Sequence, residues 1–233
     1  MSPIISLTNV VKKFPMGEGE FTALKEINLT IGEGEFTGLV GPSGSGKTTL
    51  LNIIGSLDVP SQGEAQVLGR SVSTLSAKES AALRNKSIGF IFQSYNLLPV
   101  YTVYENVEFA LLLQKMASDV RCKAVMEALA WVGLADKKKS RPAQLSGGEC
   151  QRVAIARAMV KRPAVVLADE PSANLDAENS HHILQMMRRL NYELKTTFVF
   201  ATHDEKVMQY LHRIITLQDG QISSDRYVTQ ERF

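Results

Sequence analysis

The sequence predicts an α/β fold with a mainly parallel sheet, and three observations lead to this prediction. Apolar strand-like segments alternate with segments of helical spacing, which is the pattern of strand–helix–strand units. A glycine-rich turn, "GPSGSGKTTL" at residues 41–50, joins one such strand to a helix. The 233 residues, of which 44% are hydrophobic and 21% charged, suit a globular domain with an insert.

The first part of the chain is predicted to consist mainly of strands. Residues 5–14 and 24–31 alternate apolar and polar side chains, as half-buried strands do. Residues 34–40 form an apolar strand that runs into the glycine-rich turn, and a helix is expected over 47–55. The next expected elements are a strand at 63–69, a helix at 76–85 and a strand at 87–92.

The middle of the chain, residues 94–160, is predicted to be an inserted helical subdomain. Apolar residues recur at helical spacing within 105–116, 120–134 and 147–160. The elements expected after it are an apolar strand at 164–171, a helix at 177–194, a strand at 196–204 and a hairpin at 213–222. Residues 1–93 and 161–233 are therefore expected to form one core around the insert.

Charge and cysteine content argue against several classes of function. The formal net charge of +2 is too small for a dedicated nucleic-acid-binding protein. Cys122 and Cys150 have no metal-type spacing and are expected to be free thiols in a reducing compartment.

No signal peptide is visible, and no stretch approaches the roughly 20 apolar residues that span a bilayer. Any work on a membrane would therefore need a partner that supplies the spans.

The glycine-rich turn matches the phosphate-binding loop G-x-x-x-x-G-K-[ST]. Its successive N–H groups are expected to curl around phosphate oxygens, with the positive end of the next helix beside them. Lys47 is expected to reach the β- and γ-phosphates, and the Thr48 hydroxyl to bind Mg²⁺. The alternative is a glycine-rich turn in which the lysine occurs by chance. The strand before the turn and the helix after it make this alternative the weaker one. The predicted nucleotide-binding residues are Gly41, Pro42, Ser43, Gly44, Ser45, Gly46, Lys47, Thr48 and Thr49.

Two acids, Asp169 and Glu170, end the apolar strand "VVLADEP". Ligands of open α/β sheets lie at the carboxyl ends of the strands. Asp169 is therefore expected to contact Mg²⁺, through water, and Glu170 to polarise an attacking water as a general base. A simple acidic turn is the alternative, and the phosphate loop upstream makes it the weaker one.

Six motifs occur in an order that resembles the ATP-binding cassette (ABC) family of ATPases over essentially the whole chain. They are the phosphate loop, Gln93, "LSGGECQR", "VVLADEP", "SANLD" and His203. The resemblance implies a Mg²⁺-dependent ATP hydrolase with a P-loop core and a mainly parallel sheet. It also implies an antiparallel β subdomain at the N-terminus and the helical subdomain at 94–160.

The resemblance further implies a homodimer in the ATP state. Ser146, Gly147 and Gly148 would form a second anion cradle, for the γ-phosphate held by the opposite subunit. The residues expected to lie across the dimer interface are Asn174, Leu175 and Asp176. Departures from the family pattern at Cys150, Ser172 and Ala173 affect the tuning of dimer closure rather than a catalytic group.

Three more residues receive roles from the resemblance. Gln93 would sense Mg²⁺ and the attacking water, and His203 would hold the γ-phosphate and orient Glu170. Phe14 would stack on adenine, where the family often has tyrosine. A core residue at the end of a strand is the alternative for Phe14.

Within the family, stretches such as "LRNKSIGFIFQSYNLLP" resemble the lipoprotein-releasing (LolD-like), macrolide-exporting (MacB-like) and cell-division (FtsE-like) ATPases. This similarity implies a membrane permease partner with an extracytoplasmic domain, which docks on residues 94–107, and a location on the cytoplasmic face of the cell membrane. An alternative is a regulatory ATPase that controls cell-wall hydrolases through its partner. A cassette that acts on DNA or ribosomes ranks low, because the chain lacks heptad arms and a strong charge.

Overall fold

The computed structural model describes residues 3–17 and 19–228, and these form two compact units. The first unit contains the described residues up to Arg84 and those from Thr197 onward, and the second contains Asn85–Thr196. The helical insert at 94–160 is a separate, sequence-based division and stays a prediction. Within the described residues, no helix combines the length and the apolar character needed to cross a membrane.

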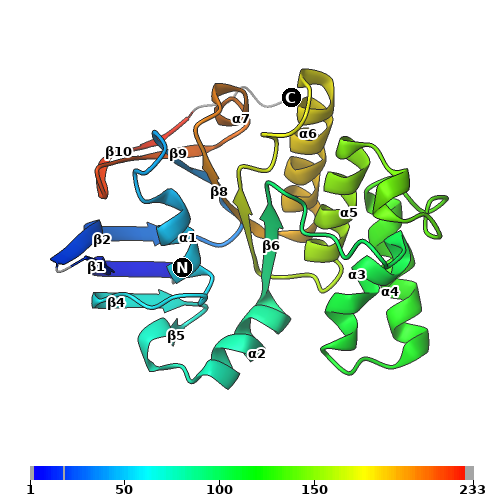
Figure 1. The fold of residues 1–233 in the computed structure, drawn as a ribbon, viewed down its shortest axis with the longest axis horizontal. Helices are drawn as coiled ribbons and strands as arrows, with labels where there is room; N and C mark the ends of the chain where they lie inside the picture. The colour runs from blue at the N-terminus through cyan, green and yellow to red at the C-terminus, as the bar shows by residue number, and fades with distance from the viewer. Residues whose placement is uncertain (1–2, 18, 229–233) are drawn as a thin grey trace. The chain divides into compact units, whose positions relative to one another are not determined.

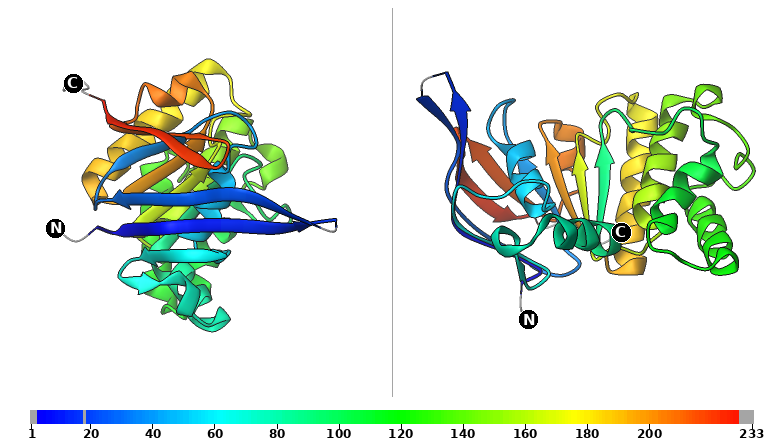
Figure 2. Two further views of the ribbon diagram at one scale, coloured as in Figure 1. Left: turned by 90° about the vertical axis from the view of Figure 1, so that its left-hand side faces the viewer. Right: turned by 60° about the horizontal axis from the view of Figure 1, so that its bottom comes forward.

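The first unit begins with an antiparallel sheet of strand order β2-β1-β4-β5, which matches the predicted N-terminal β subdomain. Its long hairpin places Ile5 opposite Ile31 and Phe14 opposite Phe21, and the two strands run side by side (Figure 2). Burial alternates within two stretches of β1, at Ile5 and Leu7 and at Val10 and Lys12, and a register shift separates the two. The strands are β1 (Ile5–Met16), β2 (Gly19–Ile31), β4 (Gln62–Val67) and β5 (Arg70–Ser71).

The strands of the second sheet that belong to this unit have the order β10-β9-β3-β8. The central strand β3 (Phe36–Val40) is buried along its whole length and pairs in parallel with β8 (Thr197–Thr202) and β9 (Arg213–Gln218). Phe36 packs on Phe200, with ring centroids 4.7 Å apart, because both side chains leave the sheet on the same face. The other elements are α1 (Lys47–Ile54), η1 (Val72–Thr74), α7 (Glu205–Met208) and β10 (Gln221–Tyr227). Helix α2 (Ala77–Ser87) begins in this unit and ends in the second.

The second unit combines a parallel strand pair with a group of helices (Figure 1). β6 (Ile88–Phe92) pairs with β7 (Val165–Asp169). Helix α5 packs against α3, α4 and α6, and most of its residues are buried. The helices are α3 (Val103–Leu112), α4 (Ser118–Trp131), η2 (Pro142–Gln144), α5 (Gly147–Met159) and α6 (Ala177–Leu194).

The elements match the sequence-based predictions closely. β2 begins at Gly19 rather than at residue 24, and α3 differs at both ends. It begins at Val103, two residues before the predicted start, because Thr102 and Glu105 form a capping box. It ends at Leu112 rather than Met116, and Lys115 adopts a φ of 55°, which no helix can continue.

A buried ion-pair network ties three distant segments of the first unit together. Arg213 makes a bidentate pair with Asp225 at 2.8 and 2.7 Å, and it donates to Thr30 O at 2.8 Å. It also pairs with Glu35 at 3.1 Å. The arginine side chain is only 8% exposed, so its charge depends on these partners rather than on water.

We expect Arg213→Met to lower the free energy of unfolding by about 2–3 kcal/mol, because the variant leaves Glu35 in a largely buried position without its cation. The effect stays below that of a fully buried pair because Asp225 is 36% exposed. Urea unfolding measures it. The matched control is Lys13→Met, which breaks the exposed Lys13–Glu20 pair and should cost less than about 1 kcal/mol. Equal losses in the two variants would contradict the structural role of Arg213.

Candidate nucleotide-binding and hydrolysis site

The glycine-rich turn lies between the carboxyl end of β3 and the start of α1. Gly46 precedes the helix with a φ of 103°, and a Cβ there would lie 2.9 Å from Ala23 O. A Cβ on Gly41 would lie 2.1 Å from Leu217 O. Only glycine therefore fits both positions, and the turn can keep its tight curl.

The curl leaves backbone donors available. The N–H groups of Ser43, Gly44 and Gly46 have no acceptor among the described residues, whereas Ser45 N donates to Pro42 O at 3.3 Å. The buried hydroxyl of Ser45 also lacks a partner in this part of the structure. Such unpaired donors around one concave turn form an anion-binding nest, and they fit a phosphate group.

Lys47 completes the loop with a buried positive charge. Its Nζ donates to Gly41 O at 2.7 Å and to Pro42 O at 2.8 Å, and the residue is only 7% exposed. The ammonium is thus held beside the unpaired amides. The first turn of α1 contains no acidic residue that would repel an anion.

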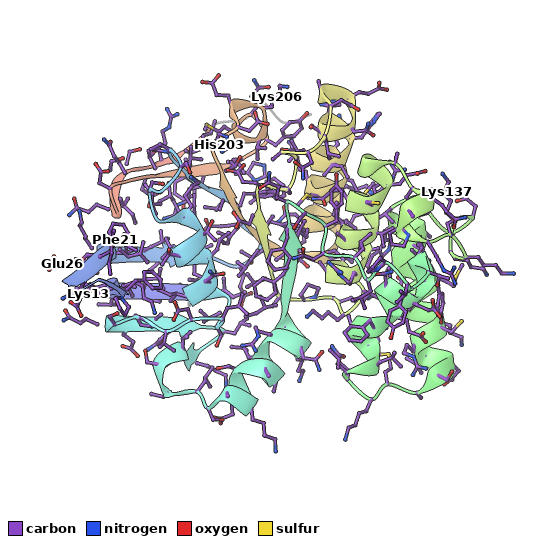
Figure 3. The ribbon with its side chains drawn as sticks, viewed as in Figure 1. Lys13, Phe21, Glu26, Lys137, His203 and Lys206 are labelled. Atoms are coloured by element: carbon purple, nitrogen blue, oxygen red, sulfur yellow. The ribbon has the colours of Figure 1, made fainter. Side chains whose placement is uncertain are left out.

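His203 lies at the same edge of the sheet as the loop. Val40 of β3 pairs with Thr202 of β8, so the residues that follow them, Gly41 and His203, both leave the carboxyl ends of neighbouring parallel strands. His203 comes just before α7 (Figure 3). The structure therefore brings together the phosphate loop and the histidine that the sequence predicted.

The second unit has an equivalent edge. Phe92 of β6 pairs with Asp169 of β7, so Gln93 and Glu170 follow directly after paired strand ends. Glu170 adopts a φ of 46°, an uncommon conformation for a side chain with a Cβ. Gln93 is also tied to the "SANLD" segment, because Asn174 Nδ2 donates to Gln93 O at 2.9 Å. Three of the predicted catalytic or metal-binding residues thus meet at one strand edge.

The "LSGG" segment forms the start of α5. Ser146 is the N-cap, and its hydroxyl accepts from Glu149 N at 3.3 Å. The first N–H groups of a helix have no acceptor within it, so Gly147 and Gly148 present donors at a positive helix end. A Cβ on Gly148 would lie 2.6 Å from Asn179 Oδ1, which explains why a glycine stands there.

A lysine that sequence reasoning did not identify supports this helix start. Lys137 (Figure 3) pairs with Glu149 Oε1, while Glu149 Oε2 accepts from Ser146 N at 2.9 Å. The hydrogen bond from Lys137 is the main cause that lowers the pKa of Glu149, and the Ser146 bond lowers it further. These two interactions hold the charged carboxylate of Glu149 at the N-terminal cap of α5.

We expect this carboxylate to make stability pH-dependent. A carboxyl whose pKa is lowered by folding stabilises the native state above its unfolded pKa of about 4.3 and loses this effect as pH falls. The melting temperature of the native chain should therefore exceed that of Glu149→Gln at pH 7, and the difference should shrink between about pH 5 and pH 3. Glu127→Gln, which removes an exposed ion pair with Arg162, is the matched control. A difference that does not change with pH would contradict this role of the charge.

Two further residues of the site region were missed by sequence reasoning. Arg157 donates to Tyr95 O at 2.6 Å and to Asn96 O at 2.5 Å, so it holds the loop that follows Gln93. Phe21, labelled in Figure 3, is 51% exposed. Its strand pairing places it opposite Phe14, which is 37% exposed. The periodicity of apolar residues in the sequence predicts neither contact, because each contact joins residues from two different segments of the chain.

Taken together, the geometry of the first unit is that of a P-loop nucleotide-binding protein. A family model described as "ABC transporter" matches residues 24–173. The lipoprotein-releasing system ATP-binding protein LolD of Bacteroides thetaiotaomicron is 44% identical over 222 residues, which cover 95% of this chain and all of that protein. The macrolide export ATP-binding/permease protein MacB of Pasteurella multocida is 44% identical over 228 residues, which cover 98% of this chain. The chain spans about a third of the MacB protein, 35% of its length.

A solved structure gives the same result for the fold. The dimeric post-hydrolysis state of the ATP-binding cassette MJ0796 with ADP and Pi has a TM-score of 0.89 and 42% identity, and the match covers 97% of this chain and 100% of that one. The chain belongs to the ABC transporter family. It is an ATP-binding cassette ATPase subunit, homologous to the ATP-binding protein LolD and to about a third of the ATP-binding/permease protein MacB.

Proposed function

We propose that this chain hydrolyses ATP as the motor of a membrane complex of the lipoprotein-release or MacB-like export type. The observation that supports it most is the nest of unpaired amides at Ser43, Gly44 and Gly46 beside the buried ammonium of Lys47. These groups suit a triphosphate, and the adjacent helix start adds further positive potential. Phe14, exposed on its strand, is the proposed stacking partner of adenine.

The proposed mechanism is in-line attack of water on the γ-phosphorus, which breaks the bond from that phosphorus to the β,γ-bridging oxygen and releases ADP. Glu170 accepts the proton of the attacking water as general base, and Gln93 orients that water. His203 donates a hydrogen bond to a γ-phosphate oxygen and keeps Glu170 in position. Lys47 and the loop amides stabilise the charge that develops on the β- and γ-phosphate oxygens.

A magnesium ion fits the donor set of the proposed site. The Thr48 hydroxyl, the Gln93 amide oxygen and the Asp169 carboxylate are hard oxygen donors, which suit Mg²⁺ together with nucleotide phosphates. When bound, the ion supplies charge stabilisation to the phosphoryl oxygens. Asp169, at the end of β7, would hold it through water.

We propose further that two copies of the chain clasp two ATP molecules head to tail. Ser146, Gly147 and Gly148 of one copy would bind the γ-phosphate that lies on the loop of the other. The relative described above as a dimeric cassette supports this assembly, and so does the free positive end of α5.

A mixing experiment tests the head-to-tail arrangement. Chains with Ser146→Arg and chains with Lys47→Ala should each be nearly inactive alone. Ser146→Arg blocks the cradle for the γ-phosphate, and Lys47→Ala removes the ammonium that binds the phosphates in the loop. A mixed dimer contains one intact composite site out of two, so it should have about half the activity of a native dimer. At a 1:1 ratio with random pairing, about half of the dimers are mixed, so about a quarter of the native activity should return. Phosphate release measured across mixing ratios reports it. If no mixture regains activity, the two halves of the site do not come from different chains.

The partner is proposed to be an integral membrane permease that docks beside the strand edge of the second unit. Leu98, Val100 and Tyr101 are exposed just after Gln93, at 36, 72 and 39%. Asn96 of the same loop lines a cavity of about 250 Å³ together with Phe90, Phe92 and Lys161, among others, and burial lowers the pKa of Lys161 to about 8. A helix of the partner could bury this apolar surface.

Pull-down in detergent tests the partner. We expect a permease with an extracytoplasmic domain to be captured, which would place this chain on the cytoplasmic face of the cell membrane. A partner whose domain binds cell-wall hydrolases would instead support the regulatory alternative. If no membrane protein is captured, both forms of the proposal fail.

A further inference from the structure

A pocket in the second unit lies away from the residues to which the proposed mechanism assigns a role. Its volume is about 540 Å³, within the range of small-molecule sites. It lies where the C-terminal end of α4 meets α5 and α6, and all of its lining residues belong to the same unit. The side chains that give it its character are Trp131, Arg152, His182, Gln185, Met186 and Arg189.

The lining is basic, and one of its cations lacks a partner. None of the lining residues is acidic. The buried Nε of Arg152 has no hydrogen-bond partner, and no described residue forms an ion pair with this side chain. Arg189 donates to Trp131 O at 2.8 Å, and among the described residues the acid that pairs with it is Glu193, 3.8 Å away on the exposed surface of α6. Arg152 therefore lines the pocket without a carboxylate partner among the described residues, and the second guanidinium, that of Arg189, has only an exposed one at 3.8 Å.

The backbone around the pocket restricts the kind of anion that the pocket can bind. Gly133 N donates to Ala130 O at 3.1 Å, and Leu134 N donates to Leu129 O at 2.9 Å, so these donors of the turn are used internally. The pocket also adjoins the C-terminal end of α4, so it lacks the free amides of a helix N-terminus that favour phosphate. The donors that remain are the guanidinium groups, and the planar guanidinium matches the planar carboxylate in a bidentate pair.

We propose that this pocket binds a small organic polycarboxylate, whose carboxylates pair with Arg152 and Arg189. The indole of Trp131 and the side chain of Met186 would contact the carbon skeleton of the ligand. The site is distinct from the nucleotide loop, and its test needs neither nucleotide nor ATPase activity.

The chain offers an internal probe, because Trp131 is its only tryptophan. We expect citrate, added without nucleotide or magnesium, to change the tryptophan fluorescence in a saturable way, with half-saturation at or below about 1 mM. Sodium chloride at the same ionic strength should produce no saturable change. An acidic peptide such as tetraglutamate forms a second arm. If only the peptide gives saturation, the pocket is a protein-docking surface and the small-molecule proposal is wrong.

Substitutions test whether the change in tryptophan fluorescence arises from citrate bound in the pocket. Arg152→Gln should weaken citrate binding by about tenfold or more, because it removes a charge-assisted pair. Should that variant not fold, Arg189→Gln, on the exposed face of α6, should give a loss of similar size. Arg188→Gln removes the same charge from the same helix outside the pocket and should leave the affinity unchanged. Arg162→Gln, which uncovers one face of the Trp131 ring, should alter only the starting fluorescence. Equal affinity in the native chain and in the pocket variants, or no saturation at all, overturns the proposal.

Discussion

Glu170→Gln should bind ATP with near-native affinity and lose at least about a hundredfold in turnover. The amide has the same shape as the carboxylate but cannot take the proton of the attacking water. Glu170 follows β7 directly, and its φ of 46° sets the direction in which the side chain leaves the strand. Because the side chain is replaced by one of equal size, this backbone geometry should survive the change.

The same variant should accumulate an ATP-bound dimer, because closure no longer leads to hydrolysis. Phosphate release measures turnover, and size-exclusion chromatography with light scattering measures the dimer. Glu178→Gln, in the first turn of α6, is the matched control and should behave like the native chain. Native hydrolysis in Glu170→Gln would remove Glu170 from its proposed role.

Lys47→Ala should weaken ATP binding by at least about tenfold, and hydrolysis with it. Its ammonium lies 2.7 and 2.8 Å from the loop carbonyls of Gly41 and Pro42. Without it, these carbonyl dipoles and the triphosphate would repel each other with no cation between them. Isothermal titration calorimetry with ATP gives the affinity, and thermal unfolding confirms that the variant is folded.

The control for this variant is Lys25→Ala, which removes an exposed lysine from β2 of the same unit. It should bind ATP like the native chain. If Lys47→Ala also kept near-native affinity, the amides alone would carry the binding and the proposed role of the lysine would be wrong.

Much of the site was predictable because its parts are local. The loop needs glycines, a lysine and a helix start within ten residues, and each requirement is visible in "GPSGSGKTTL". Asp169 and Glu170 stand out because they end an apolar strand, and Ser146 because it caps a helix after a polar turn. The strand and helix boundaries followed for the same reason, since periodicity and caps act over a few residues.

The sequence by itself determined the order of strands and helices, the phosphate loop and the motifs that indicate an ABC ATPase. The tertiary structure alone decided which distant charges meet. Arg213 pairs with Glu35 across 178 positions, Lys137 pairs with Glu149 at the cap of α5, and Arg152 lines a basic pocket. The physical reason is that a charge has no preferred partner along the chain: its partner is whichever group the packed strands and helices bring within a few ångströms.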